Sequence, residues 1–300
     1  MAAIRLGTRG SLLARSQSAL VAAEIQRRFQ LDVEIIPITT SGDRITDRPL
    51  YEAGGKGLFV KELELGLLSG EIDFAVHSCK DVPVTMPLVD QSDLVIAAIP
   101  TRLDPRDVMI CREGATIDQL PIDCIVATGS LRRQCQLLDR RRDLRIQSIR
   151  GNIDTRIRKL QAGEFGATIL ALAGLTRAGL FDPSLMHPLS LEEMLPASGQ
   201  GALALQCRRG DKNTMDVLAQ LDDPAARATV EAERAVVAAL NCDCHSPIAV
   251  LGQIENQTLQ LRAALGRSGG DPPVRHARAH VPLTKTADAV ADIVRQLSLH

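Results

Sequence analysis

The sequence contains no tryptophan, and aromatic residues account for only 2% of its 300 positions. Proteins that bind single-stranded nucleic acids usually stack bases on aromatic side chains, so the composition disfavours that class. The formal net charge is −1, with 35 Lys and Arg against 36 Asp and Glu, and such a balance supplies no general attraction to nucleic acid or to an anionic membrane. We expect no nucleic-acid partner, although salt-dependent retention on DNA would revive that hypothesis.

Long apolar runs are also missing. No window approaches the roughly 18 apolar residues that a membrane helix requires. The segment after Met1 lacks the apolar stretch of a signal peptide and the Arg- and Ser-rich composition of a transit peptide. The seven cysteines are scattered along the chain. These absences predict a cytoplasmic protein without a membrane partner, whose thiols are free in a reducing compartment.

The sequence does contain short apolar runs that alternate with longer segments of helical periodicity, which is the pattern of βαβ units and predicts an α/β fold. Strands are expected at 4–6, 33–39, 73–76, 124–128, 144–149, 167–172, 196–208, 248–253, 258–265 and 274–281, and helices at 12–30, 58–68, 229–241 and from about Thr284.

Three domains are expected from this order of segments, in agreement with the length of the chain. The first comprises 1–100 and 197–220, because the apolar strand at 196–208 can return to the first sheet. The second comprises 101–196 and is rich in arginine, and the third comprises 221–300, a smaller α+β part.

Arginines replace the usual acidic residues at one expected helix start. Ser130 is a good N-cap, but Arg132 and Arg133 occupy the first turn, where the positive end of the helix dipole favours Asp or Glu. An anion bound at this helix end would relieve the repulsion. The alternative is that both arginines lie solvated on an exposed face.

Similar loops occur elsewhere in the chain. Arg9 lies in the Gly/Ser segment 7–11, and Arg150 and Gly151 precede a helix that carries Arg156. Arginine suits planar carboxylates as well as phosphates. The segment 54–57, which contains Lys56, lacks the spacing of a nucleotide-binding phosphate loop and is a weak signal.

Asp81 is the candidate catalytic carboxylate. It follows a predicted buried strand, next to Lys80 and four residues after His77, at the carboxyl end where open α/β sheets bind their ligands. Among basic groups we expect it to be ionised and to stabilise a developing cation. On the residues alone, an equally good interpretation is that Asp81 caps the turn before Pro83 and pairs with Lys80.

The segment 242–245 brings together Cys242, Asp243, Cys244 and His245. A closed zinc site requires further ligands, and no second pair with suitable spacing is present, so we expect no metal. A disulfide between residues two positions apart would be strained. A thiolate that forms a covalent bond to a cofactor and a pair of inert thiols are equally compatible with this pattern.

Five motifs in order resemble the hydroxymethylbilane synthase family, also called porphobilinogen deaminases. The resemblance extends along nearly the whole chain, from Thr8-Arg9 to Pro247-Ile248. The motifs are GGKGLFVKE at 54–62, HSCKDVP at 77–83, SLRRQ at 130–134, RGN at 150–152 and GQG at 199–201.

The resemblance implies a transferase of tetrapyrrole, porphyrin and heme biosynthesis. Four porphobilinogen molecules join head to tail, with release of ammonia, to give hydroxymethylbilane. It also implies a dipyrromethane cofactor held through a cysteine thioether, and the spacing from 232–235 to Pro247 places Cys244 at the attachment position. The implied fold has two doubly wound α/β domains like those of type-2 periplasmic binding proteins plus a small α+β C-terminal domain, in a monomer.

The resemblance also assigns site residues. Asp81 falls on the catalytic aspartate, with Lys80 beside it. The positions implied for cofactor binding are Arg9, Ser11, Lys80, Asp81, Ser130, Arg132, Arg133, Arg150, Gly151 and the covalent Cys244, and those implied for the substrate or growing oligopyrrole chain are Arg9, Gln17, Lys56, Arg150, Arg156 and Gln200.

The chain departs from the family pattern in the attachment loop. Residues 241–246 read Asn-Cys-Asp-Cys-His-Ser, where Gly-Gly-Cys-Gln is common, so the thiol of Cys242 could compete with that of Cys244. The strongest alternative function is a non-catalytic anion-binding module with two α/β lobes, such as a solute-binding protein. That alternative explains Arg9, Arg132 and Arg150 but leaves Asp81 without a role.

Overall fold

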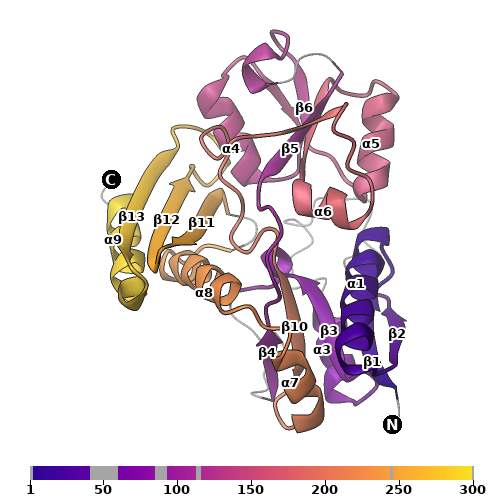
Figure 1. The fold of residues 1–300 in the computed structure, drawn as a ribbon. Helices are drawn as coiled ribbons and strands as arrows, with labels where there is room; N and C mark the ends of the chain where they lie inside the picture. The colour runs from indigo at the N-terminus through magenta and orange to yellow at the C-terminus, as the bar shows by residue number, and fades with distance from the viewer. Residues whose placement is uncertain (1–2, 41–59, 85–92, 113–115, 244–245, 299–300) are drawn as a thin grey trace. The chain divides into compact units, whose positions relative to one another are not determined.

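The computed structural model describes residues 3–40, 60–84, 93–112, 116–243 and 246–298. The chain divides into two compact units. Unit 1 comprises Met1–Leu103 and Ala202–Arg227, and unit 2 comprises Asp104–Gly201 and Ala228–His300. Each unit contains a five-stranded sheet, and unit 2 also contains a three-stranded sheet (Figure 1).

Unit 1 is built on a sheet with the strand order β2-β1-β3-β10-β4. Strand β1 runs parallel to β2 and β3, whereas β10 runs antiparallel to β3 and β4. The expectation that a distant apolar strand returns to this sheet is therefore confirmed. The strands are β1 (Ile4–Arg9), β2 (Val33–Ile38), β3 (Phe74–Ser78), β4 (Leu94–Ala98) and β10 (Leu203–Arg208).

The core of unit 1 lies between this sheet and its helices. Leu6, Ile25 and Phe74 are completely buried there, and burial of large apolar side chains is the main favourable term in folding. Gly7 allows a close approach, because a Cβ atom there would lie 2.2 Å from Ile72 Cδ1. The helices described in this unit are α1 (Leu12–Phe29), α3 (Lys61–Leu68) and α7 (Lys212–Ala219).

Two strand boundaries differ by three residues or more from those predicted. Strand β1 continues to Arg9, so this arginine ends a strand instead of lying in a loop. Strand β10 begins at Leu203, not near residue 196. Gly199 and Gly201 have φ values of +69° and +89°, which glycine adopts readily, and they form a turn ahead of the strand.

Unit 2 contains a second mixed sheet, with the order β7-β6-β8-β5-β9. Strand β6 is parallel to β7 and β8, while β5 is antiparallel to β8 and β9. The strands are β5 (Asp107–Cys111), β6 (Ile125–Ala127), β7 (Arg145–Gln147), β8 (Ala167–Ala171) and β9 (Met186–Pro188), and the helices are α4 (Leu131–Arg140), α5 (Ile153–Gln161) and α6 (Leu172–Arg177).

The C-terminal part forms an antiparallel sheet, β11-β12-β13. Its strands are β11 (Ile248–Glu255), β12 (Thr258–Leu265) and β13 (Arg275–Pro282), accompanied by α8 (Pro224–Ala239) and α9 (Thr286–Ser298). The predicted class is confirmed: two α/β sheets and a small α+β part. The predicted domain boundaries stay a prediction.

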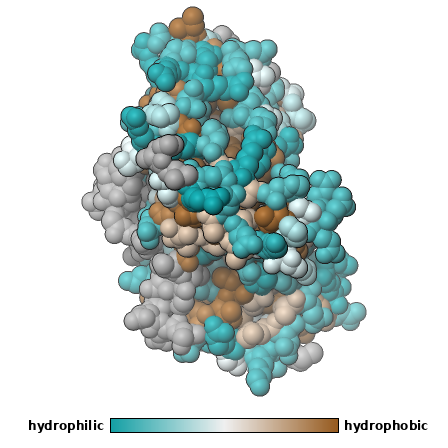
Figure 2. Space-filling model, turned by 90° about the vertical axis from the view of Figure 1, so that its left-hand side faces the viewer, coloured by the Kyte–Doolittle hydropathy of each residue, from teal (hydrophilic) through white to brown (hydrophobic). Residues whose placement is uncertain are grey.

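Hydrophilic residues cover much of the face drawn in Figure 2. Within the described ranges, the large hydrophobic side chains that are exposed are separated in the sequence, for example Leu20, Ile122 and Leu185. No helix among these residues has both the length and the apolar character needed to cross a bilayer.

Candidate functional site

The candidate carboxylate Asp81 lies at the carboxyl end of β3. A short 3-10 helix, Cys79–Asp81, follows this strand directly, and the parallel register of β1 and β3 places the end of β1, with Arg9, at the same edge of the sheet. Arg9 also acts electrostatically on His77, which belongs to β3. The structure therefore places Arg9, Lys80 and Asp81 at the same edge of the sheet, the edge at which parallel strands bind ligands.

The Asp81 side chain is exposed. The turn that contains it is closed by the backbone, since the Val82 N–H donates to the Cys79 carbonyl at 3.2 Å. Among the described residues, the Asp81 carboxylate makes no hydrogen bond or ion pair. The alternative in which Asp81 caps this turn and pairs with Lys80 is therefore wrong, and its carboxylate is available to a ligand.

Two further predicted site residues make structural hydrogen bonds near this edge of the sheet. Gln17 is buried, and its Nε2 donates to Ser78 Oγ at 3.0 Å while Ser78 Oγ donates to Gln17 Oε1 at 3.2 Å. Ser11 is the N-cap of α1, where its hydroxyl accepts from the Ala14 N–H at 3.3 Å. The Gln17 contacts hold α1 against the end of β3, and the Ser11 contact caps the start of α1. The roles of Gln17 and Ser11 toward substrate and cofactor stay predictions.

A buried chain of hydrogen-bonded polar side chains connects β3 with β10 and α3. Gln206 Nε2 donates to Glu64 Oε1 at 2.9 Å, which leaves Gln206 Oε1 as an acceptor 2.9 Å from His77 Nε2. His77 is therefore the tautomer with its proton on Nε2. Burial, together with the charge of Arg9 and against the opposing hydrogen bond to Gln206, lowers the pKa of His77 to about 4.

This low pKa predicts a loss of stability in mild acid. In the unfolded chain His77 takes up a proton near pH 6.5, whereas in the folded state it stays neutral to about pH 4, so the unfolded state gains protons as the pH falls through this interval. Between pH 7 and pH 5 the free energy of unfolding should drop by about 2 kcal/mol from this residue.

Urea unfolding of the wild type and of His77→Gln at both pH values measures this effect. Glutamine cannot titrate but retains a polar group beside Gln206, so the variant should show the smaller drop. An equal pH dependence in the two proteins would show that His77 does not cause it.

Arg132 and Arg133, in the first turn of α4, face an internal carboxylate. Arg132 Nη1 lies 2.7 Å from Asp107 Oδ2, and Arg133 Nη2 lies 2.8 Å from Asp107 Oδ1. Both arginines are buried, with 5% and 6% of their surfaces exposed. The alternative of two solvated arginines is therefore wrong. The carboxylate that these arginines face belongs to the protein itself, and a bound anion at this helix end stays a prediction.

Gln200 also lies against Asp107. Its Nε2 donates to Asp107 Oδ1 at 3.0 Å and to the Pro105 carbonyl at 2.7 Å. The turn that carries Gln200 is held by the buried Glu233, which accepts from the Gly199 N–H at 2.6 Å and from the Gly252 N–H at 2.8 Å. Gln200 is thus part of the Asp107 cluster in unit 2, and its substrate role stays a prediction.

The second arginine loop precedes α5. Gly151 has a φ of +108°, and a Cβ atom at this position would lie 2.8 Å from Thr155 Cγ2, so glycine is required for the turn. The Gly151 carbonyl accepts from Arg156 Nε at 2.9 Å. This bond fixes Arg156 beside the loop that contains Arg150.

Ser130 lies at the start of the other arginine-bearing helix, α4. Its hydroxyl makes no capping hydrogen bond to that helix.

The segment 241–246 is described only in part, since Cys244 and His245 lie outside the described residues. Lys56, in a different segment, also lies outside them. Cys242 is half-buried, and burial raises the pKa of its thiol. Asp243 and Ser246 hold the loop closed, with the Asp243 N–H donating to Ser246 Oγ at 3.0 Å and that hydroxyl donating to Asp243 Oδ1 at 3.1 Å. All six cysteines among the described residues are free thiols.

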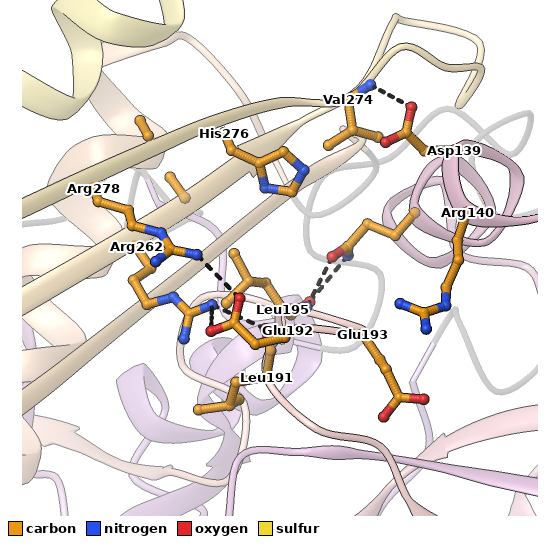
Figure 3. Close-up of a pocket in the computed structure, with 13 residues that line it drawn as sticks. Asp139, Arg140, Leu191, Glu192, Glu193, Leu195, Arg262, Val274, His276 and Arg278 are labelled. Atoms are coloured by element: carbon orange, nitrogen blue, oxygen red, sulfur yellow. Dashed lines mark hydrogen bonds and ion pairs between the residues drawn. The ribbon is translucent and has the colours of Figure 1, made fainter. Parts of the chain in front are cut away.

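A cavity of about 380 Å³ lies in unit 2 beside α4, β12 and β13 (Figure 3). Glu192 bridges Arg262 and Arg278 in its wall, at 2.7 and 3.0 Å. Two other lining residues, Gln136 and Leu195, reach the arginine cluster: Gln136 Nε2 donates to the carbonyls of Arg132 and Leu195, each at 3.1 Å. None of the residues predicted as site residues lines this cavity.

Three functional candidates, Asp107, Gln136 and Glu233, were not predicted. The available signal for Asp107 was a carboxylate at the start of an otherwise apolar strand, β5, since a buried acid is rarely tolerated without a partner. Its arginine partners lie 25 and 26 positions away in the sequence. No short-range pattern connects residues at that separation.

Sequence models of one family match both parts of the chain. Residues 4–216 match "Porphobilinogen deaminase, dipyromethane cofactor binding domain", and residues 227–296 match "Porphobilinogen deaminase, C-terminal domain". A porphobilinogen deaminase of Acidothermus cellulolyticus is 44% identical over 309 aligned positions, covering 99% of this chain and 88% of the relative. One of Brevibacillus brevis is 46% identical over 268 positions, covering 89% and 85%.

The similarity to solved structures is more distant. A periplasmic substrate-binding protein of an ABC transporter from Coxiella burnetii matches with a TM-score of 0.45 at 17% identity, over 75% of this chain and 94% of the other. The methionine-binding protein MetQ matches with a TM-score of 0.46 at 14% identity, over 73% and 89%. Because these TM-scores are low, the family assignment rests on the sequence matches and not on the solved structures.

Proposed function

Because the chain belongs to the porphobilinogen deaminase family, we propose that Asp81 is its catalytic carboxylate and that Cys244 holds its cofactor. The enzyme is a transferase of tetrapyrrole biosynthesis that polymerises four porphobilinogen molecules head to tail, with release of ammonia, into hydroxymethylbilane. Its cofactor is dipyrromethane. The observation that carries the proposal for Asp81 is the exposed carboxylate at the sheet edge that also carries Arg9.

The donors in the described residues fit a cofactor rich in carboxylates. Each porphobilinogen unit carries an acetate and a propionate, and carboxylates bind best to guanidinium groups and free backbone N–H groups. Arg133 Nε is buried without a hydrogen-bond partner, and the Ser130 hydroxyl does not cap its own helix. We propose that these groups, with Arg9, Ser11, Lys80, Arg132, Arg150 and Gly151, bind the cofactor.

The substrate and the growing chain add further carboxylates. We assign their binding to Arg9, Gln17, Lys56, Arg150, Arg156 and Gln200. Fixed positive groups offset the repulsion among accumulating carboxylates, and guanidinium groups keep their charge at any physiological pH. The family's chemistry therefore supplies a function for the arginine-rich second third of the chain.

Asp81 acts by charge. When bound, the cofactor supplies the pyrrole carbon that attacks the incoming substrate. The Asp81 carboxylate stabilises the positive charge that develops on the substrate's pyrrole as ammonia departs, and accepts a hydrogen bond from the pyrrole N–H. Lys80 is placed beside it to bind a neighbouring carboxylate. Because the departing amine is protonated near neutral pH, the enzyme has little need of a strong general acid.

We propose that the thiolate of Cys244 forms the thioether to the cofactor. Burial raises the pKa of the Cys242 thiol and so reduces its thiolate fraction, which argues against Cys242 as the attachment point. The segment 221–300 then serves as a third domain that carries the attachment loop, alongside domains at 1–100 with 197–220 and at 101–196. Separate family matches to 4–216 and 227–296 support a division near this point.

We further propose that the enzyme works as a monomer in the cytoplasm, without a nucleic-acid or membrane partner. The free thiols of the described cysteines suit a reducing compartment. Light scattering on the purified protein measures its mass in solution, and a dimer mass would refute the monomer.

Intact mass tests the proposed function directly. Protein expressed in a host that makes porphobilinogen should carry the added mass of two condensed pyrrole units, and it should convert porphobilinogen to hydroxymethylbilane. An unmodified mass together with reversible binding of anionic ligands would favour the non-catalytic anion-binding alternative.

A further inference from the structure

Asp107 is the centre of a buried polar cluster in unit 2. It has no exposed surface, and its two oxygens accept from three side chains. Oδ2 accepts from Arg132 Nη1 at 2.7 Å, and Oδ1 accepts from Arg133 Nη2 at 2.8 Å and from Gln200 Nε2 at 3.0 Å. These donors come from the first turn of α4 and from the 197–201 turn, so one carboxylate connects two separate segments with β5.

The cluster contains more positive than negative charge. One carboxylate faces two guanidinium groups, and the remaining partners are neutral carbonyls: Arg132 Nη1 also donates to Leu195 at 2.7 Å, and Arg133 Nη1 donates to Ile169 at 2.8 Å. Burial alone would raise the pKa of Asp107, but the two arginines outweigh burial and hold that pKa well below its usual range. The carboxylate is ionised, and a surplus of one positive charge remains.

Stability alone does not account for such a cluster. The desolvation of three buried charges offsets much of their mutual attraction, and apolar replacements of buried ion pairs are often neutral or stabilising. The surplus charge and the unpartnered Arg133 Nε each add a further cost. A carboxylate ligand at the start of α4 would relieve both, and the α4 dipole would favour it as well.

We propose that Asp107 is a positioning residue for cofactor binding. It orients the guanidinium groups of Arg132 and Arg133 in the first turn of α4 and leaves them one negative charge short, and a cofactor carboxylate supplies that charge. Gln200 contributes by holding Oδ1 with a neutral donor, so that it fixes the carboxylate without changing the charge balance. This inference rests on the proposed role of Arg132 and Arg133 in cofactor binding.

Asp107→Asn tests the inference, because asparagine keeps the volume and removes the charge. We expect folded protein, isolated by gel filtration and checked by circular dichroism, of which less than about one tenth carries the cofactor mass. Asp118→Asn is the matched control. Asp118 pairs with Arg140, the last residue of the same helix, on the exposed surface, and this variant should load fully.

A second variant decides the case if Asp107→Asn does not fold. Asp107→Glu keeps the charge but displaces the carboxylate by one methylene group, so it should fold and load incompletely. In its loaded fraction, KM for porphobilinogen should rise at least several-fold while kcat changes less. Full loading with an unchanged KM in either variant would overturn the inference and leave Asp107 a structural residue.

The outcomes separate this inference from the proposed function. A wild-type protein without the cofactor mass would refute the function itself. A loaded wild type with fully loaded Arg132→Gln and Arg133→Gln variants would remove the premise that these arginines bind the cofactor. A loaded wild type, impaired arginine variants and a fully loaded Asp107→Asn would refute the positioning role alone.

Discussion

Asp81→Asn is expected to reduce the rate of hydroxymethylbilane formation by roughly two orders of magnitude or more, the range seen when a preorganised electrostatic group is removed. The side chain is exposed and makes no bond among the described residues, so the fold does not depend on it. Asparagine retains the shape and a hydrogen-bond acceptor but not the charge that stabilises the cationic substrate. Porphobilinogen consumption and product formation under saturating substrate measure the effect.

The matched control is Asp216→Asn, which removes an acidic residue from α7 in the same unit and should leave the rate unchanged. The melting temperature of Asp81→Asn should stay within about 1 °C of the wild type, since surface substitutions away from special contacts have small effects. Retention of most activity by Asp81→Asn would remove this residue from the mechanism. A large fall in melting temperature would show that Asp81 supports the fold after all.

The edge that carries Asp81 was predictable because its determinants are local. The apolar run before His77 indicated a buried strand, the prolines at 83 and 87 indicated its end, and ligands bind at the carboxyl ends of parallel strands. The extension of β1 to Arg9 was missed because the register with β2, which pairs Arg9 with Ile38, is a tertiary effect. Local propensity does not report such pairing.

The arginine site of unit 2 was predictable only in part. Arg132 and Arg133 at a helix start indicate an anion, because they oppose the helix dipole. Burial of both side chains and their pairing with Asp107 depend on the packing of α4 against β5. A sequence shows the need for a counter-charge but not its source, and only the structure places Asp107 beside both arginines.

Cys244→Ser is expected to abolish cofactor attachment. The thioether requires a thiolate as the nucleophile, and a serine hydroxyl does not ionise near neutral pH. The variant should therefore have the unmodified protein mass after expression in a host that makes porphobilinogen, and it should form no hydroxymethylbilane. Intact mass, followed by peptide mapping of the segment around residues 241–246, measures the attachment independently of activity.

Cys242→Ser is the control that the attachment loop itself provides. Burial raises the pKa of the Cys242 thiol against the opposing hydrogen bond to Ser246. A serine hydroxyl can replace the thiol in that hydrogen bond, so the control should keep the cofactor and close to full activity. Loss of the cofactor only in Cys242→Ser would move the attachment point by two residues. Partial loading in both variants would show that the two thiols compete, because each would then capture the cofactor in the absence of the other.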